Sequence, residues 1–399
     1  MSAQTSVAGG PNDPTFALSA DRRPDVDWLR AFAVLLLVPF HTGLLFCDWG
    51  FFPLKTGENH EAFAYFCGIL HQFHMPLLFA LSGIGSWFAL RKRTPGQYVE
   101  ERFKRLFVPL VFGTIVIAPP QTYLQRVNEG AFNGSYLQFY PDFCKGIYPK
   151  GNLSWMHMWF VLYLFVFSLI CVRLFMRIRE SRDSGIRERT ATLCEKRGGI
   201  FLLVIPIVLS EILLRPAFPG MQNLVWDWAN FITYISYFIF GFLIMSDERF
   251  QMALDRDGGF ALAFALGTLG VGIAINLLKI VPPLGYSPGS MLSQTLGAVN
   301  RWFFVLTILC YGRRFLSFSN RLLPYVSEAT YPFYILHQTV ICLIGFKVMR
   351  WNMSAGLRFL IICALTFAAT IIIYDLFARR TNGARYLFGM KPMKRGESL

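Results

Sequence analysis

The sequence predicts an all-α protein that crosses a membrane about ten times and keeps both termini in the cytoplasm. Composition is the first reason. Of the 399 residues, 54% are hydrophobic and only 16% are charged, whereas soluble proteins carry about a quarter charged residues. Apolar runs long enough to span a bilayer recur along the whole chain. The basic residues stand at the ends of these runs, where the charges that set membrane topology belong.

Ten apolar segments have lengths near the roughly 20 residues that a transmembrane helix needs. They cover residues 29–48, 63–90, 106–124, 156–176, 199–214, 230–246, 260–280, 291–311, 330–349 and 356–378. The second segment is long and the fifth is short, so we expect their edges to be the least well defined.

The basic residues test this count. Lys and Arg are concentrated in the second-to-third, fourth-to-fifth and eighth-to-ninth connections and in the carboxyl-terminal tail. All four lie on one side if the chain crosses ten times with both termini cytoplasmic, and cytoplasmic loops carry an excess of cations. This excess of Lys and Arg in cytoplasmic loops accounts for the net charge of +14. A role in binding nucleic acid is not expected.

Three regions follow from this pattern: a disordered cytoplasmic tail over residues 1–26, one transmembrane domain over 27–378, and a basic cytoplasmic tail over 379–399. The first 21 residues contain no Lys or Arg, so they make a poor signal peptide. The eight cysteines form no C-x-x-C pair and no His/Cys cluster, so neither a disulfide framework nor a metal site is expected.

The first segment combines charges at its start with a histidine in its interior. Arg30 and His41 are eleven residues apart; this is about three helical turns, so the two side chains share a face and stand roughly 16 Å apart. That distance is about half of a hydrocarbon core of roughly 30 Å. Ionisable groups at membrane depth usually mark a functional site. The alternative is a snorkelling arginine with a histidine bonded to a neighbouring helix.

The second segment also brings histidines into the membrane. His71 and His74 are three residues apart and share a helical face. Counted inward from residue 63, His74 lies near mid-depth, comparable to His41. Ser82 and Gly83 follow, and small residues of this kind are typical either of a site or of a close contact between two helices.

Other charged residues stand inside or at the mouth of apolar segments. Arg102 and Arg105 lie one turn apart at the start of the third segment, and guanidinium groups suit phosphates; the alternative is a positive-inside anchor. Glu211 precedes Arg215 by four residues, the spacing of a structural ion pair. Arg301 lies in the middle of the eighth segment without an obvious partner, which makes it a site candidate.

The fourth and ninth segments complete the polar interior. His157 and Trp159 open the fourth near the outer surface, where aromatic residues also suit an interfacial belt. In the ninth, Tyr331, Tyr334 and His337 are spaced by three and form one stripe. His337 stands about 15 Å inside the cytoplasmic surface. Cations at the rim and histidines deeper inside suit a substrate with an anionic head and a reactive end that reaches the membrane centre.

Taken together, these motifs resemble the membrane acyltransferase 3 family. The resemblance rests on Arg30-x10-His41, Phe73-His74-Met75-Pro76 followed by Ser82-Gly83, Arg102-x-x-Arg105, His157-x-Trp159-Phe160 and Tyr331-x-x-Tyr334-x-x-His337. It runs in the family's order from about residue 25 to residue 378. Three short stretches are most similar to the periplasmic-glucan succinyltransferase branch: Val38-Pro39-Phe40-His41, Leu213-Leu214-Arg215-Pro216 and Leu387-Phe388-Gly389-Met390-Lys391-Pro392.

The resemblance implies a multi-pass enzyme of the bacterial inner membrane. It would move a succinyl or acetyl group from cytosolic acyl-CoA, a co-substrate and not a permanently bound cofactor, to hydroxyls of an extracytoplasmic carbohydrate such as a periplasmic or surface glucan. The chain carries no fused esterase-like domain of the kind found in some relatives. We therefore expect it to act alone or with a separate extracytoplasmic partner protein.

The resemblance makes His41 the central catalytic residue. By role, the expected catalytic residues are His41, His74, His337 and Tyr334, the acyl-CoA-binding residues are Arg30, Arg102 and Arg105, and the substrate-binding residues are His157, Trp159 and Arg301. Arg301 would meet the free carboxylate if succinyl-CoA is the donor.

The chemistry fits this layout, because a sugar hydroxyl is a poor nucleophile and needs a base in the transition state. A buried, neutral imidazole can accept that proton. Direct transfer and a covalent acyl-enzyme both remain open. The main rival function is a secondary transporter, or a flippase for a lipid-linked sugar, that uses the same polar interior. The density of intramembrane histidines argues against a third function, a non-catalytic scaffold.

Overall fold

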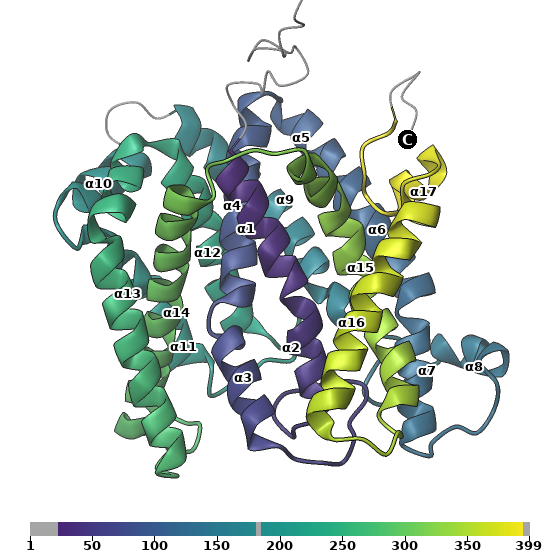
Figure 1. The fold of residues 1–399 in the computed structure, drawn as a ribbon. Helices are drawn as coiled ribbons and strands as arrows, with labels where there is room; N and C mark the ends of the chain where they lie inside the picture. The colour runs from purple at the N-terminus through teal and green to yellow at the C-terminus, as the bar shows by residue number, and fades with distance from the viewer. Residues whose placement is uncertain (1–22, 181–184, 394–399) are drawn as a thin grey trace, which may run out of the picture.

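The computed structural model describes residues 23–180 and 185–393. These residues form helices that run along one common direction as a bundle (Figure 1). Their only β feature is an isolated bridge between Ile147 and Leu153. The all-α prediction is confirmed.

The helices follow one another along the chain with mostly short connections. The first half contains α1 (Pro24–Leu35), α2 (Leu37–Leu44), α3 (Glu61–His71), α4 (His74–Arg91), α5 (Pro95–Arg102), α6 (Val108–Phe112), α7 (Pro119–Asn128), α8 (Tyr136–Phe143) and α9 (Trp159–Glu180). The second half contains α10 (Ile186–Glu195), α11 (Ile205–Leu214), α12 (Trp228–Ser246), α13 (Glu248–Leu277), α14 (Pro288–Phe315), α15 (Leu322–Val348), α16 (Ala355–Ile373) and α17 (Asn382–Leu387). Short 3-10 helices cover Met156–Met158 and Gly199–Val204, and π-helical turns cover Phe103–Phe107, Gly113–Ile117 and Tyr374–Ala378.

Within the described residues, nine helical stretches are long and apolar enough to cross a membrane. They correspond to nine of the ten predicted segments: α1 with α2, α3 with α4, α5 through α7, α9, α12, α13, α14, α15 and α16. The remaining segment, predicted to be short, is the apolar helix Gly199–Leu214. With about 2.0 Å per residue in its 3-10 part and about 1.5 Å in its α part, it is roughly 27 Å long.

The two described ends of the chain lie at the same end of the bundle (Figure 1). The connections from α4 to α5 and from α14 to α15 also lie there. We name this end, which carries Arg91, Arg105, Arg314 and Arg379, the basic end, and the opposite one the far end. Basic residues mark cytoplasmic loops, so we predict that the basic end faces the cytoplasm.

The two predicted tails lie in different situations. Residues 1–22 of the first tail are outside the described residues, and α1 begins at Pro24. The other tail packs against the bundle as far as Met390, because Phe388 and Met390 are both buried in the main hydrophobic core. Residues 394–399 are outside the described residues. The segment through Met390 is therefore part of the folded domain.

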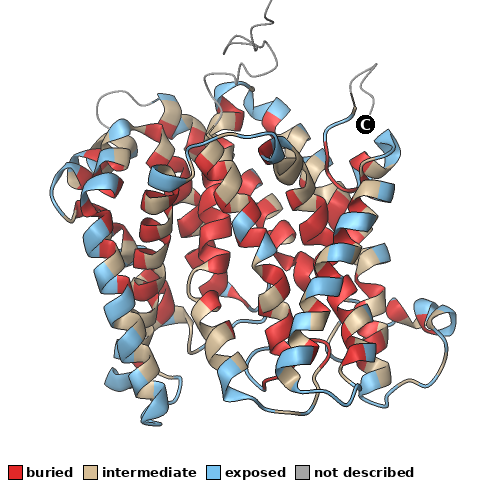
Figure 2. Cartoon of the chain, viewed as in Figure 1, coloured by how far each residue is buried: buried red, intermediate tan, exposed pale blue. Residues whose placement is uncertain are grey.

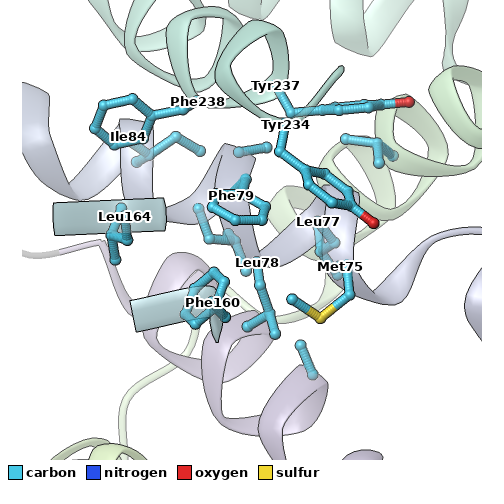
Figure 3. Close-up of a cluster of buried hydrophobic side chains, with 14 of the residues drawn as sticks. Met75, Leu77, Leu78, Phe79, Ile84, Phe160, Leu164, Tyr234, Tyr237 and Phe238 are labelled. Carbon is cyan, nitrogen blue, oxygen red and sulfur yellow. The ribbon is translucent and has the colours of Figure 1, made fainter. Parts of the chain in front are cut away.

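The core lies in the middle of the bundle, and exposed residues run along α13 and α16 (Figure 2). Aromatic side chains of α4, α9 and α12 form its centre (Figure 3). The ring of Phe79 lies 4.7 Å from that of Phe160 and 4.8 Å from that of Tyr234, measured between centroids. These contacts hold α4 between the two other helices.

Glycines allow α4 and α12 to touch backbone to backbone. A Cβ atom on Gly83 would lie 1.9 Å from the carbonyl oxygen of Phe238, and one on Gly241 would lie 1.9 Å from that of Ala80. Any larger residue would push the helices apart, as small residues at membrane helix contacts generally show. The structure supports the helix-contact interpretation of Gly83.

The first three predicted spans are interrupted helices. α1 and α2 are separated at Leu36, and α3 and α4 at Gln72 and Phe73. Pro76 explains the second break, since proline is tolerated in the first turn of a helix but blocks the continuation of a preceding one. In the third span Pro109 cannot donate a hydrogen bond, and a π-helical turn forms in front of it. Such irregular backbone at membrane depth is tolerated where it is buried in protein or lines a cavity.

Candidate active site

Two of the predicted histidines meet in the middle of the bundle. His41 comes from α2 and His337 from α15. The Nδ1 atom of His41 lies 3.0 Å from the Nε2 atom of His337. On its other side, His337 Nδ1 lies 2.6 Å from the backbone carbonyl oxygen of Tyr334. The three groups form a continuous hydrogen-bonded chain.

This chain fixes where the protons stand. A carbonyl oxygen only accepts hydrogen bonds, so Nδ1 of His337 is the donor to Tyr334. A neutral His337 then has its lone pair on Nε2, and His41 Nδ1 must donate to it. The remaining nitrogen of a neutral His41, Nε2, carries a lone pair. That atom is able to accept a proton from a substrate.

His157 lies in a second network, in which both of its ring nitrogens have protein partners. Nε2 lies 3.0 Å from the carbonyl oxygen of Ile335, and Nδ1 lies 3.3 Å from the amide nitrogen of Gln121. The same amide nitrogen donates to Thr339 at 2.7 Å, and Gln338 donates to the amide oxygen of Gln121 at 2.9 Å. His157, predicted to bind substrate, is placed to hold α15 against α7.

Gln121, Gln338 and Thr339 were missed by the sequence analysis. All three are buried. The available signal was the presence of two amide side chains in apolar segments, Gln121 directly after a Pro-Pro pair and Gln338 directly after His337. Polar side chains at membrane depth form hydrogen bonds between helices, so this signal indicated a network.

Tyr334 lies against the histidine pair, whereas Trp159 packs in the aromatic core. The hydroxyl of Tyr334, a predicted catalytic group, donates a hydrogen bond to the backbone carbonyl of His157. Trp159, predicted to bind substrate, packs its ring 5.5 Å from Tyr163 and 5.6 Å from Tyr234 within the core. Both side chains are buried. The contacts of Tyr334 suit a residue that positions the histidines.

His74 is buried close to the histidine pair without a hydrogen bond to it. Both of its ring nitrogens lack a hydrogen-bond partner among the described residues. Its ring stands edge-on to Phe40 at 4.9 Å, and Phe40 stands edge-on to His41 at 5.0 Å. A buried polar group without a partner costs about 1–3 kcal/mol. Such a group calls for an explanation, and a substrate atom that bonds to it is one.

The three predicted arginines gather towards the basic end. The charges of Arg102 and Arg105 both act on Arg30, and they also act on Tyr331 of α15. We name Arg30, Arg102 and Arg105 the arginine cluster. Like charges this close repel one another, and an anion between them would relieve that repulsion.

Arg105 and Arg102 make contacts within the protein, but the cluster retains a hydrogen-bond donor without a partner. Arg105 donates from Nε to the carbonyl of Gly389 at 3.0 Å and from Nη1 to Glu101 at 3.4 Å. Arg102 stacks its guanidinium 4.6 Å from the ring centroid of Tyr98. The Nε atom of Arg102 is buried and has no hydrogen-bond partner in the part of the chain that the structure describes. Guanidinium donors of this kind bind phosphate well.

The predicted stripe on α15 connects the two regions. The ring of Tyr331 stacks 6.3 Å from that of Tyr334, and Tyr334 lies 5.8 Å from His337. Six residues of α-helix span about 9 Å. The hydroxyl of Tyr331 is buried and unpartnered within the described residues. The stripe runs along one face of α15 from beside the arginine cluster to the histidine pair.

Arg301 has a partner that the sequence did not reveal. Its Nη2 atom lies 3.1 Å from Glu211 Oε2, while Arg215 lies 2.6 Å from Glu211 Oε1. The predicted Glu211–Arg215 pair is confirmed, and the expectation that Arg301 lacks a partner is corrected. Glu211 comes from α11 and Arg301 from α14, so only the folded chain brings them together. Arg215, Arg301 and Glu211 thus form a second charged group, with two cations and one carboxylate.

The loop of residues 45–60 covers the histidine pair at the far end. Phe52 stacks 5.7 Å from His41. Glu58 holds the loop to α16 through hydrogen bonds of 2.7 and 2.8 Å from Arg358, and His60 lies 3.1 Å from the same carboxylate. Hydrogen bonds from Arg358 and then His60 keep the pKa of the Glu58 carboxyl below its ordinary value.

Comparison with known proteins identifies the family of the chain. Residues 23–375 match a protein family described as an acyltransferase domain. Two curated relatives, each named glucans biosynthesis protein C, come from Escherichia coli strain K12 and Escherichia coli O1:K1. They are 25% and 24% identical, over 95% of this chain and 97% of each relative. No solved structure matches the chain. The family match covers the arginine cluster, the histidine pair, nine predicted spans and most of the tenth, and the chain therefore belongs to the acyltransferase 3 family.

Proposed function

We propose that the protein is an O-acyltransferase of the bacterial inner membrane. It takes a succinyl or acetyl group from acyl-CoA at the basic end and gives it to a hydroxyl of a carbohydrate that arrives from the far end. The family supports acyl transfer, and the name of the distant relatives supports a glucan as acceptor. One observation carries the proposal: the hydrogen-bonded pair of His41 and His337, in which Nε2 of His41 is the ring nitrogen that keeps a free lone pair.

The arginine cluster suits the donor. Coenzyme A carries several phosphate charges, and three guanidinium groups at the basic end can neutralise them and form charge-assisted hydrogen bonds. The pantetheine arm is long and uncharged, so it can follow the stripe of Tyr331 and Tyr334 towards His41. The unpartnered Nε of Arg102 and hydroxyl of Tyr331 supply donors along this path.

The transfer step uses His41 Nε2 as the general base. The acceptor hydroxyl gives its proton to Nε2 while its oxygen attacks the thioester carbonyl carbon. The new C–O bond forms, the C–S bond breaks, and protonated His41 returns the proton to the thiolate of coenzyme A. Throughout the step His337 accepts the hydrogen bond from His41 Nδ1. It thereby orients the base and stabilises the charge that develops on it, as a third group does in other base-assisted acyl transfers.

His74 would assist at the thioester oxygen. A neutral imidazole carries one N–H, and in His74 both ring nitrogens are buried and unpartnered among the described residues. A hydrogen-bond donor aimed at an oxygen that becomes negative in the transition state is commonly a large contributor to acyl transfer. His157 and Tyr334 hold the helices that carry the reacting groups.

The proposal predicts that His41→Ala abolishes O-acylation. Loss of a general base lowers turnover by about 10²–10⁴-fold. Mass spectrometry of extracytoplasmic glycans, from cells with the wild-type protein or His41→Ala, measures the result directly. His60→Ala, which changes an exposed histidine of the loop, is the matched control. Glycans that keep their acyl groups with His41→Ala would contradict the proposal and revive the transporter or flippase alternative.

A further inference from the structure

A cleft of about 420 Å³ lies towards the far end of the bundle. One wall is α3 together with Trp49 of the loop of residues 45–60, and the other is formed by α13 and α14 (Figure 1). Its polar lining groups are Glu61, Gln72, Thr268, Asn276, Ser293 and Asn300. We infer that this cleft binds a sugar ring of the acceptor carbohydrate. The inference rests on the proposed function and locates the acceptor site.

Asn300 supplies the strongest sign of a missing ligand. Its amide nitrogen donates to the carbonyl of Ala265 at 2.8 Å and to the hydroxyl of Thr268 at 2.7 Å. A carbonyl only accepts, so the nitrogen must face Ala265 and the amide orientation is fixed. The amide oxygen is buried and has no hydrogen-bond partner among the described residues, and Asn300 as a whole is 4% exposed. A ligand hydroxyl would satisfy this acceptor.

Trp49 supplies an aromatic surface at the same cleft. Its side chain is partly exposed, and its ring is held edge-on against His71 at 5.3 Å and against Phe40 at 6.5 Å. The C–H face of a pyranose ring packs on such an aromatic surface, while amide side chains bond its hydroxyls. Ligand sites typically combine apolar walls with a few fixed polar groups, in volumes of about 300–1,000 Å³. The cleft has both features.

Its charge separates this cleft from the donor site. Among the described residues that line it, Glu61 is the only charged one. Arg301 borders the cleft, since its Nη2 would lie 3.7 Å from a Cβ on the lining residue Gly297, but it is held in an ion pair with Glu211 at 3.1 Å. A neutral, hydroxyl-rich ligand fits the lining, and the arginine cluster lies towards the other end of the bundle. The two substrates would thus approach the histidine pair from opposite directions.

The cleft leads towards the proposed base. Trp49 contacts Phe40, and Phe40 contacts both His41 and His74, with ring centroids 6.5, 5.0 and 4.9 Å apart. A sugar stacked on Trp49 is therefore one aromatic side chain away from the histidines. The buried ring of Phe40 would have to move before a hydroxyl on that sugar, or on its neighbour in the glycan, could meet Nε2 of His41.

A glycine pair on α13 allows a clean test. Gly272 lines the cleft, and a Cβ added to it would meet no described atom within 4 Å. Gly270, two residues earlier, is equally open but is not among the lining residues. Gly272→Phe should fill the cleft without disturbing the fold, and Gly270→Phe is its matched control. Unchanged acyl-CoA binding by both variants would show that they are folded.

The measurement is binding of a linear glucose hexasaccharide to the full-length protein in lipid nanodiscs. A second arm uses the same hexasaccharide attached to a polyprenyl diphosphate, because the cleft lies between membrane-spanning helices. We expect Gly272→Phe to weaken binding at least tenfold relative to wild type and Gly270→Phe to leave it unchanged. If Gly272→Phe weakens binding of the free hexasaccharide, the acceptor is a soluble glycan. If it weakens binding of the polyprenyl-linked hexasaccharide alone, the acceptor is a lipid-linked glycan.

Two results would overturn the inference: a wild-type protein that binds neither probe, or a Gly272→Phe protein that binds like wild type. These outcomes are separable from the fate of the proposed function. If Gly272→Phe transfers acyl groups with an unchanged KM for the glycan, the cleft is not the acceptor site, yet the protein is still an acyltransferase. If Gly272→Phe loses glycan binding but neither the wild type nor the variants transfer acyl groups, the cleft is confirmed as a glycan site and the proposed reaction is wrong.

A second pair of variants tests the aromatic surface. Trp49→Ala should raise the KM for the glycan several-fold and leave the KM for acyl-CoA unchanged. Trp351→Ala changes another exposed tryptophan, outside the lining of the cleft, and should alter neither value. Equal glycan KM values for the two variants would remove Trp49 from the acceptor site.

Discussion

The histidine region and the arginine cluster are both polar, yet they differ in burial and in how far the protein itself completes their hydrogen bonds. His337 is buried, whereas the side chains of Arg30 and Arg105 are 37% and 40% exposed. Around the histidine pair, the ring nitrogens of His157 and His337 and the amide of Gln121 all have partners, while the ring nitrogens of His74 have none among the described residues. In the arginine cluster and on the stripe beside it, Arg102 Nε and the Tyr331 hydroxyl have none within the described residues.

We call the histidine region the prepared region, because its groups are already oriented, and the arginine cluster with the stripe beside it the receiving region, because it keeps donors open for a ligand. Catalytic groups act best when they are already oriented, because no reorganisation is then needed in the transition state. A binding site for a large anion can instead leave donors unsatisfied, at about 1–3 kcal/mol each, and recover that free energy when the ligand arrives. Changes in the first region should therefore lower kcat, and changes in the second should weaken donor binding.

The largest effect is expected for His337→Ala. This variant removes the acceptor that holds His41 Nδ1, so kcat should fall by about 10²–10³-fold, while the KM for acyl-CoA changes little. In His337→Gln the amide can donate to the Tyr334 carbonyl and accept from His41. The hydrogen bond recovered from His41 should make kcat about tenfold higher in His337→Gln than in His337→Ala. Steady-state kinetics with acyl-CoA and a glycan acceptor measure both values.

A purely structural role for His337 would give a different pattern. Both variants would then lose folded protein and acyl-CoA affinity together, and His337→Gln would show no selective recovery of kcat. That pattern would remove His337 from the orientation of the base and would weaken the contrast between the two regions.

An intermediate effect is expected for Gly389→Ala, which acts on the receiving region. A Cβ atom there would lie 2.6 Å from a ring carbon of Tyr331 and 2.7 Å from the carbonyl oxygen of Arg105, and the backbone φ is +65°. The segment must shift, so Arg105 loses its hydrogen bond to the Gly389 carbonyl. We expect the Kd for acyl-CoA to rise about three- to tenfold, with kcat nearly unchanged.

Gly383→Ala is the matched control, because a Cβ at Gly383 in the same segment meets no described atom within 4 Å. Arg102→Ala gives the reference for direct damage to the donor site. If Gly389→Ala and Gly383→Ala bind acyl-CoA equally, the carboxyl-terminal segment does not position Arg105. Binding can be followed by calorimetry on the purified protein.

The smallest effect concerns the loop that covers the prepared region. The folded-state pKa of Glu58 is lowered, so its stabilising contribution is complete above the ordinary value of about 4.3 and is lost as the pH falls through the lower folded value. Glu58→Gln should lower the Tm at neutral pH by about 1–2 °C, because the pair is partly exposed. The difference from wild type should vanish at low pH.

The partner residue provides the control for this experiment. In an Arg358→Met background, Glu58→Gln should cause a smaller loss of Tm than in wild type, because only the contact of Glu58 with His60 remains to be lost. Thermal unfolding in detergent, followed at several pH values, measures all four proteins. A difference between wild type and Glu58→Gln that persists below the folded pKa would show that the ion pair does not fasten the loop.

The sequence was most informative where helix geometry alone relates the residues. The stripe of Tyr331, Tyr334 and His337 follows from a spacing of three, and the structure places these side chains in ring contact as predicted. The pairing of Glu211 with Arg215 follows from a spacing of four in the same way. In both cases one helix carries all the partners.

The sequence was least informative where partners come from different helices. Arg301 appeared to lack a partner because Glu211 lies ninety positions earlier in the chain. The network of His157 depends on Gln121, another span away, and its hydrogen bonds exist only after α7, α9 and α15 have packed. Pro76 was visible in the sequence, but residues 63–90 were predicted as one continuous segment. The structure divides them into α3 and α4.

The glycine contact between α4 and α12 has a mechanical consequence. With Gly83 and Gly241 each seated against a carbonyl of the opposite helix, the two backbones interlock and resist sliding past one another. Transporters of the rocking type need one half of the molecule to swing against the other. His74 is therefore carried by a helix that is locked to its neighbour, and α4 and α12 would have to move as one unit in any motion of that kind.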